Sequence, residues 1–88
     1  MIILHAAPVT WFSPNGVTFA VQSAVAAQNA LPDCRAALLI TSREAGVPPP
    51  LEFPVFRLGE GFGFSRGRLP AGLPEPFRRP DLVVFHST

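Results

Sequence analysis

The sequence predicts an α/β domain built on a parallel β-sheet, and three observations carry this prediction. Apolar runs without polar alternation lie near both ends, at residues 2–5 and 82–85. Such runs are typical of strands that are covered on both faces, as in parallel sheets. Between them, residues 2–40 follow a strand, helix and strand pattern, which is a βαβ unit. The chain is 48% hydrophobic and 15% charged, which excludes a disordered polypeptide.

The first strand is expected at Ile2–His5, and a long loop should follow it. Residues 6–16 contain two prolines and a glycine, which interrupt regular structure. The loop is longer than a minimal strand-to-helix turn needs, and such loops often carry function. At its end, Asn15 and Gly16 form a polar bend just before the helix.

An amphipathic helix is predicted from Val17 to Ala30, followed by a second strand at Ala36–Ile40. Apolar side chains recur near i, i+4, i+7 and i+8, which gives one stripe that should face the sheet. The stripe consists of Val17, Val21, Ala24, Val25 and Leu31. Pro32 should end the helix, because proline disfavours the helical conformation in the residue before it. The resulting βαβ unit is expected to be right-handed.

The pattern weakens after Thr41. Three prolines at 48–50 predict an extended segment, and residues 55–58 predict a short third strand. Residues 59–64 alternate glycine with larger residues and are interpreted as a loop, and Leu82–Phe85 is the fourth strand. Only one convincing helix accompanies these strands, so one face of the sheet is expected to lack its cover and the domain to be incomplete.

Composition bounds the function classes. The chain has seven basic residues, all of them arginine, and six acidic residues. The net charge of +1 gives no sign of the positive surface that binds nucleic acid. The single Cys34 cannot form an internal disulfide, so a reducing, cytoplasmic compartment is expected. The start of the chain lacks a basic signal-peptide region, and residues 17–31 are too short and polar to span a bilayer. A soluble protein, with at most peripheral membrane contact, is predicted.

The start of the predicted helix is a candidate phosphate site. A strand that runs through a glycine turn into a helix leaves free N–H groups and the positive end of the helix dipole at the carboxyl end of the strand. Asn15, Gly16 and Val17 would supply these groups. Gly16 could equally be a plain turn residue at a helix start.

Taken in order, these motifs resemble the amino-terminal half of retaining GT-B glycosyltransferases. The resemblance rests on Met1-Ile-Ile-Leu-His, the proline-bearing loop, Asn15-Gly16-Val17 opening a helix, and Pro80-Asp-Leu-Val-Val-Phe-His-Ser. It is greatest for family four, the group-one transferases that build bacterial polysaccharides and glycolipids. It implies that residues 1–88 are a partial amino-terminal Rossmann-like domain on the acceptor side. The carboxy-terminal domain that binds the nucleotide sugar is absent from this sequence.

The resemblance also implies roles for individual residues. Asn15, Gly16 and Val17 fall on the loop and helix start that face the donor diphosphate, and His86 falls on a polar position near the acceptor. The implied partners are a nucleotide-sugar donor and a sugar or lipid-linked acceptor, with no cofactor and no metal. No catalytic residue is assigned, and the fragment is expected to be inactive by itself.

Other interpretations stay open. His5 is expected to be a packed, hydrogen-bonded histidine rather than a metal ligand, because carboxylate and cysteine partners are lacking. Trp11 could stack on a sugar ring, but capping the edge of the sheet is the preferred interpretation. The alternative for the whole chain is a small non-catalytic α/β module that binds a phosphate-bearing ligand or a protein partner.

Overall fold

The computed structural model describes residues 1–42, 44–57 and 72–86. In these ranges the chain forms four strands and one helix. They are β1 (Ile2–Ala7), α1 (Gly16–Asn29), β2 (Arg35–Ile40), β3 (Val55–Arg57) and β4 (Leu82–Phe85). The predicted elements are confirmed, each to within two residues at its ends. The glycine-alternating segment, residues 59–64, lies outside the described residues.

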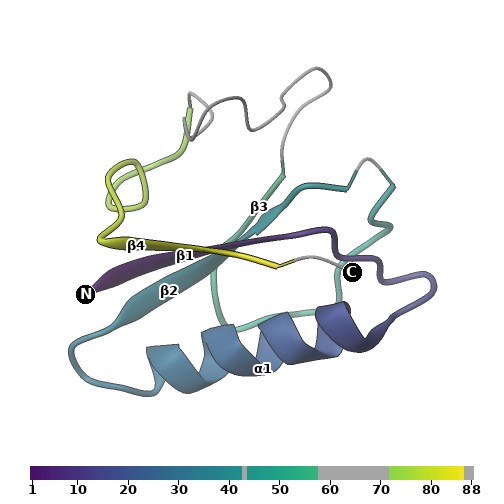
Figure 1. Cartoon of the computed structure of the whole chain (residues 1–88), viewed down its shortest axis with the longest axis horizontal. Coiled ribbons are helices and arrows are strands. Elements are labelled where there is room, and N and C mark those ends of the chain that lie inside the picture. The colour runs from purple at the N-terminus through teal and green to yellow at the C-terminus, as the bar shows by residue number, and fades with distance from the viewer. Residues whose placement is uncertain (43, 58–71, 87–88) are drawn as a thin grey trace.

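The four strands form one parallel sheet in the order β3-β2-β1-β4 (Figure 1). Leu4 of β1 pairs with Ala37 of β2 on one side and with Val83 of β4 on the other. The first and last described strands are therefore direct, parallel neighbours. This confirms the predicted parallel sheet and is consistent with an incomplete Rossmann-like arrangement.

Helix α1 begins at Gly16, directly after its N-cap residue Asn15. Asn15 has an extended backbone, with φ −115° and ψ −179°, and its side-chain oxygen accepts a hydrogen bond from the Thr18 N–H at 3.0 Å. Ser, Thr, Asp and Asn are favoured at this position because they satisfy an N–H that has no partner within the helix. The residue three positions later, Thr18, is itself fully buried.

The face of α1 that packs on the sheet differs in part from the predicted stripe. Val21 and Val25 are fully buried, as the spacing indicates, and Thr18 joins them. Leu31, by contrast, is 54% exposed, so its assignment to the buried stripe was wrong. It lies beyond the end of the helix at Asn29, where the helical spacing no longer sets its direction.

The helix side of the sheet holds the larger of two cores. Ile3, Leu38 and Ile40 pack there against Val21 and Val25 of α1. The connection from β2 to β3 contributes the buried Ala45 and the partly buried Phe53 to the same core. This face is therefore covered by the helix and, beside it, by the extended chain that leads to β3.

The opposite face is not bare, which corrects the expectation of a missing cover. Leu4 and Leu39 are buried there at 0% and 1% exposure, beneath Leu73 and Phe77 from the segment that precedes β4. The Phe77 ring also contacts Phe56 of β3, with ring centroids 5.6 Å apart. The sequence prediction missed this cover because residues 72–81 form turns rather than a helix with a recognisable spacing.

Asn29, the last residue of α1, ties the helix to β2. Its side-chain amide donates to the carbonyls of Val25 (3.1 Å) and Ala36 (2.8 Å), and its oxygen accepts from the Ala36 N–H at 2.9 Å. Ala36 faces the same edge of β2 as Leu38, whose N–H bonds to Pro54 at the start of β3. The Asn29 carboxamide thus takes the place of a neighbouring strand before β3 begins.

Within the described ranges, no helix combines the length and the apolar character needed to cross a membrane.

Candidate functional site at the carboxyl edge of the sheet

The strand order singles out the carboxyl end of β1 as a position where a ligand could bind. The chain leaves β1 through α1 to reach β2 on one side, whereas β4 lies on the other side of β1. In open parallel sheets, ligands bind outside the carboxyl ends of the strands at such a switch in strand order. In Figure 1 the start of α1 and the end of β4 lie at this same end of the molecule.

The start of α1 offers two unpaired N–H groups at this edge. No described residue accepts a hydrogen bond from the N–H of Gly16 or Val17, whereas that of Thr18 is capped by Asn15. The first turn contains no acidic side chain. The helix start therefore presents partial positive charge with no carboxylate in its own first turn to oppose an anion.

The loop before the helix is held by a buried hydroxyl. Thr18 Oγ1 accepts from the Thr10 N–H at 3.2 Å and lies within hydrogen-bond distance of two acceptors, Thr10 O and Asn15 Oδ1. The Thr10 hydroxyl donates to Ser13 O at 2.8 Å. These bonds fix residues 10–15 against the first turn of α1, so the direction of the free N–H groups is fixed as well.

Gly16 faces open space. A Cβ built on this residue meets no atom within 4 Å, and its backbone does not need the left-handed conformation that favours glycine. The fold itself thus does not require glycine at this position. A side chain there would instead occupy the space in front of the helix start.

Two histidines are paired here: the buried His5 of β1 and the partly buried His86, which directly follows β4. His5 is only 2% exposed, and its Nδ1 is 2.9 Å from Nε2 of His86, with the two rings stacked at 5.2 Å between centroids. On its other side, His5 Nε2 is 2.6 Å from Oε1 of Gln28. The prediction of a packed, hydrogen-bonded His5 is confirmed.

The hydrogen bonds fix the tautomers of the neutral pair. With the Gln28 oxygen facing it, His5 Nε2 carries the proton and donates, so His5 Nδ1 must accept. His86 Nε2–H is then the donor, and His86 Nδ1 keeps a lone pair. No described residue hydrogen-bonds to that nitrogen, which makes it the basic atom of the site.

The pKa of His86 lies below its ordinary value of 6.5. The larger cause is partial burial of the ring, which disfavours the charged form, and the smaller cause is repulsion from the neighbouring His5. The unfolded chain therefore takes up this proton at a higher pH than the folded chain. Above about 6.5 both states are neutral, and stability should fall as the pH drops from there towards the lowered pKa. We expect the urea midpoint of unfolding to decrease between pH 7.5 and 5.5, and His86→Gln to flatten this decrease. An NMR titration that gives His86 a pKa at or above 6.5 would contradict the prediction.

The structure brings some of the predicted residues together. Asn15, Gly16 and Val17 form one continuous helix start, although the Asn15 side chain is engaged as the cap. His86 turns towards His5, and no described contact joins it to the helix start. Sequence reasoning missed Gln28, because a glutamine on a helix carries no signal of a strand histidine that lies opposite.

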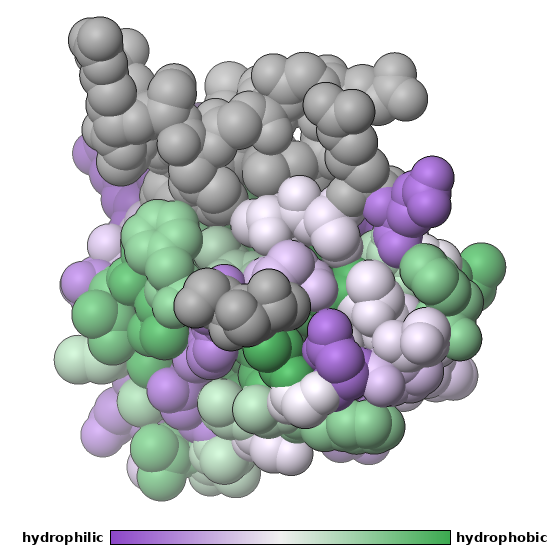
Figure 2. All heavy atoms as spheres, turned by 45° about the vertical axis from the view of Figure 1, so that its right-hand side comes forward, coloured by the Kyte–Doolittle hydropathy of each residue, from purple (hydrophilic) through white to green (hydrophobic). Residues whose placement is uncertain are grey.

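The surface of this region is mixed. Figure 2 turns the right-hand side of Figure 1 forward and shows apolar and hydrophilic patches interspersed over it. Among the described residues, no three or more His, Cys, Asp or Glu side chains are grouped so that they could hold a metal ion.

Comparison with models of protein families, with curated proteins and with solved structures finds no match for this chain.

Proposed function

We propose that the chain is the amino-terminal, acceptor-side part of a GT-B glycosyltransferase that uses a nucleotide-sugar donor in bacterial polysaccharide or glycolipid synthesis. The observation that carries the proposal is the pair of free N–H groups, on Gly16 and Val17, at the carboxyl edge of a parallel sheet. The resemblance in the order of the sequence motifs supports it further.

In this proposal the helix start acts on the leaving group. A nucleotide diphosphate gathers negative charge as its bond to the sugar breaks, and preorganised N–H groups with a helix dipole stabilise that charge. His86, with its free Nδ1, lies on the acceptor side. The donor itself is held by a second domain, so the 88-residue chain binds diphosphate weakly and transfers no sugar.

Gly16→Val tests the phosphate contact. Because a Cβ at residue 16 meets no protein atom, the variant should fold as the native chain does. Its side chain should block the approach of a phosphate, and we expect affinity for uridine diphosphate to fall at least tenfold, about 1.4 kcal/mol. The shifts of the amide signals of residues 16 and 17 on addition of uridine diphosphate measure this. In a protein that joins this chain to a donor-binding domain, turnover should fall by the same factor.

Ser23→Val is the matched control, because it places the same side chain at an exposed position in the middle of α1. It should leave diphosphate affinity unchanged. Equal affinity in the native chain and in a folded Gly16→Val variant would refute the phosphate contact.

The alternative, a non-catalytic module that binds a phosphate-bearing ligand, uses the same two N–H groups. The two proposals differ at His86. In the enzyme joined to its donor domain, His86→Ala should raise the KM for the acceptor and leave the KM for the donor unchanged. A module would show no sugar transfer in any form, whatever stands at residue 86.

A further inference from the structure

A chain of hydrogen bonds joins Gln28 of α1 to His86 through the buried ring of His5. His5 Nε2 lies 2.6 Å from Gln28 Oε1, and His5 Nδ1 lies 2.9 Å from His86 Nε2. Because His5 is 2% exposed, water does not replace either partner. The last turn of the helix, the first strand and the residue after β4 are thus linked at one point, although they lie far apart in the sequence.

Gln28 sets the direction of this chain of hydrogen bonds. Its carboxamide oxygen can only accept, so the facing His5 Nε2 must carry the proton. The tautomers of both rings follow from this single contact, and His86 Nδ1 is left with a lone pair. A side chain at residue 28 that can only donate would select the opposite tautomers, and His86 would then carry its proton on Nδ1.

His86 Nδ1 is accessible to a ligand. In the described ranges, Trp11 Nε1 is the one buried side-chain nitrogen or oxygen that has no hydrogen-bond partner. No described residue bonds to His86 Nδ1 either, so this atom, on a residue that is itself only partly buried, must be in contact with solvent. Because the pKa of His86 lies below 6.5, its lone pair is free of a proton above that pH.

We propose that Gln28 and His5 are positioning residues, which hold His86 in the tautomer whose Nδ1 accepts a hydrogen bond from a ligand hydroxyl. Such a bond points the hydroxyl proton at the imidazole and leaves the lone pairs of the oxygen free to attack. The opposite tautomer would donate to the oxygen and occupy one of these lone pairs. The hydroxyl is that of the sugar or lipid-linked acceptor, so the proposal rests on the proposed function.

The 88-residue chain allows a direct test of the tautomers. It contains two histidines, and an imidazole ¹H–¹⁵N spectrum distinguishes a ring nitrogen that carries a proton from one that has a lone pair. At about pH 8, well above the ordinary pKa of histidine, we expect native His86 to have a single form, with its proton on Nε2. Gln28→Met removes the acceptor and should let both rings relax towards the mixed tautomers of free histidine. Gln28→Lys, which can only donate, should move the proton of His86 to Nδ1.

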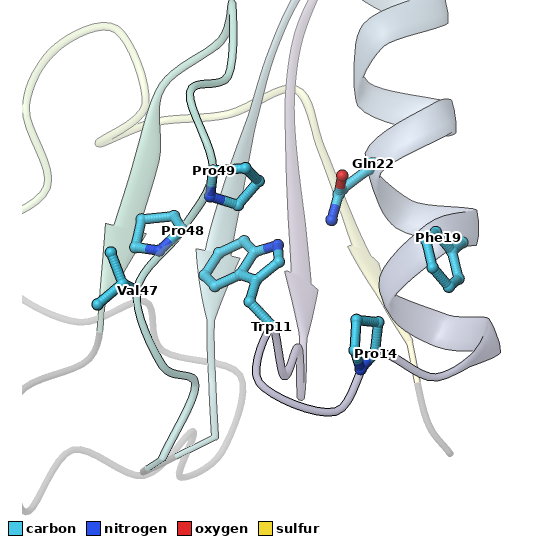
Figure 3. Close-up of a pocket in the computed structure, with 7 residues that line it drawn as sticks. All are labelled: Trp11, Pro14, Phe19, Gln22, Val47, Pro48 and Pro49. Atoms are coloured by element: carbon cyan, nitrogen blue, oxygen red, sulfur yellow. The ribbon is translucent and has the colours of Figure 1, made fainter.

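Two further variants serve as controls. Gln28→Glu keeps an oxygen that accepts from His5 and should retain the native tautomers. Gln22→Lys places the same charge on the same helix, where the side chain lies in the groove beside Trp11 and not at His5 (Figure 3). It should leave the signals of both histidines unchanged.

Steady-state kinetics of the enzyme joined to its donor domain separate this role from a purely structural one. The reversed hydrogen bond in Gln28→Lys still holds the acceptor, so the KM for the acceptor should change little. We expect kcat to fall about tenfold, because the hydroxyl is wrongly oriented. Gln28→Glu should restore most of the turnover.

The proposal is overturned if the His86 Nδ1 signal is the same in the native chain, in Gln28→Met and in Gln28→Lys. It is also overturned if the tautomers respond as expected and kcat does not change. A joined enzyme that transfers no sugar, in a chain whose tautomers respond as expected, would refute the proposed function and with it the acceptor role of His86. Gln28 would then remain the residue that sets the tautomer.

Discussion

Replacing Leu4 with alanine is expected to lower the free energy of unfolding by about 2–5 kcal/mol, far more than a typical surface substitution does. Leu4 is fully buried in β1, a strand with neighbours on both sides. Its side chain fills the space between the sheet and the cover formed by Leu73 and Phe77. Small domains have total stabilities of about 5–15 kcal/mol, so the variant should be partly unfolded near room temperature if the chain lies at the low end.

Urea unfolding followed by circular dichroism measures this loss. Leu31→Ala is the matched control, because the same atoms are removed from a side chain that is 54% exposed. It should change stability by no more than about 0.5 kcal/mol. Similar losses for the two variants would show that the second face of the sheet is not packed as described.

Asn29→Ala should lower stability by about 1–3 kcal/mol, although alanine is the better helix former. The carboxamide makes three hydrogen bonds, two of them to the backbone of Ala36, which is fully buried. Without it, the N–H and carbonyl of Ala36 have no strand beside them, since β3 begins to pair only at Leu38.

Asn29→Asp separates the parts of this contact. It keeps an oxygen that can accept from the Ala36 N–H, but it replaces the donating amide with a carboxylate oxygen that faces two carbonyls at the negative end of the helix dipole, so we expect a loss at least as large as for alanine. Hydrogen exchange at the Ala36 N–H gives a local measure and should accelerate most in the alanine variant. Unchanged stability and exchange in Asn29→Ala would contradict the bridging role.

The strands could be predicted from the sequence because apolar runs such as Ala36–Ile40 report directly on burial from both sides. The start of α1 could also be predicted from neighbouring residues alone. An asparagine and a glycine directly before apolar residues at helical spacing indicate that a helix begins there. The buried Thr18 was not among the residues expected to face the sheet, and Leu31 was wrongly placed among them, because tertiary context decides both positions. A hydroxyl is buried where it ties down a loop, and an apolar residue is exposed where the helix has ended.

The candidate site was predictable only in its separate parts. The helix start is local in the sequence, and its residues were found there. The contact of His5 with His86 depends on the adjacency of β1 and β4, which single runs of residues do not encode. Gln28 and the unpaired Trp11 N–H depend in addition on the directions of side chains, and these follow only from the packed structure.

The pairing of β1 with β4 has a consequence for how the chain folds. A ribosome delivers the amino terminus first, so β1, α1 and β2 can associate early, whereas Leu82 can reach Ile3 only after the more than forty residues between β2 and β4 have been made. Asp81 then secures the pairing, since its carboxylate accepts from the Ile2 N–H at 2.7 Å. Until that moment the outer side of β1 is an open strand edge. During synthesis, a strand that is central in the native sheet is thus for a time an edge open to pairing with another chain.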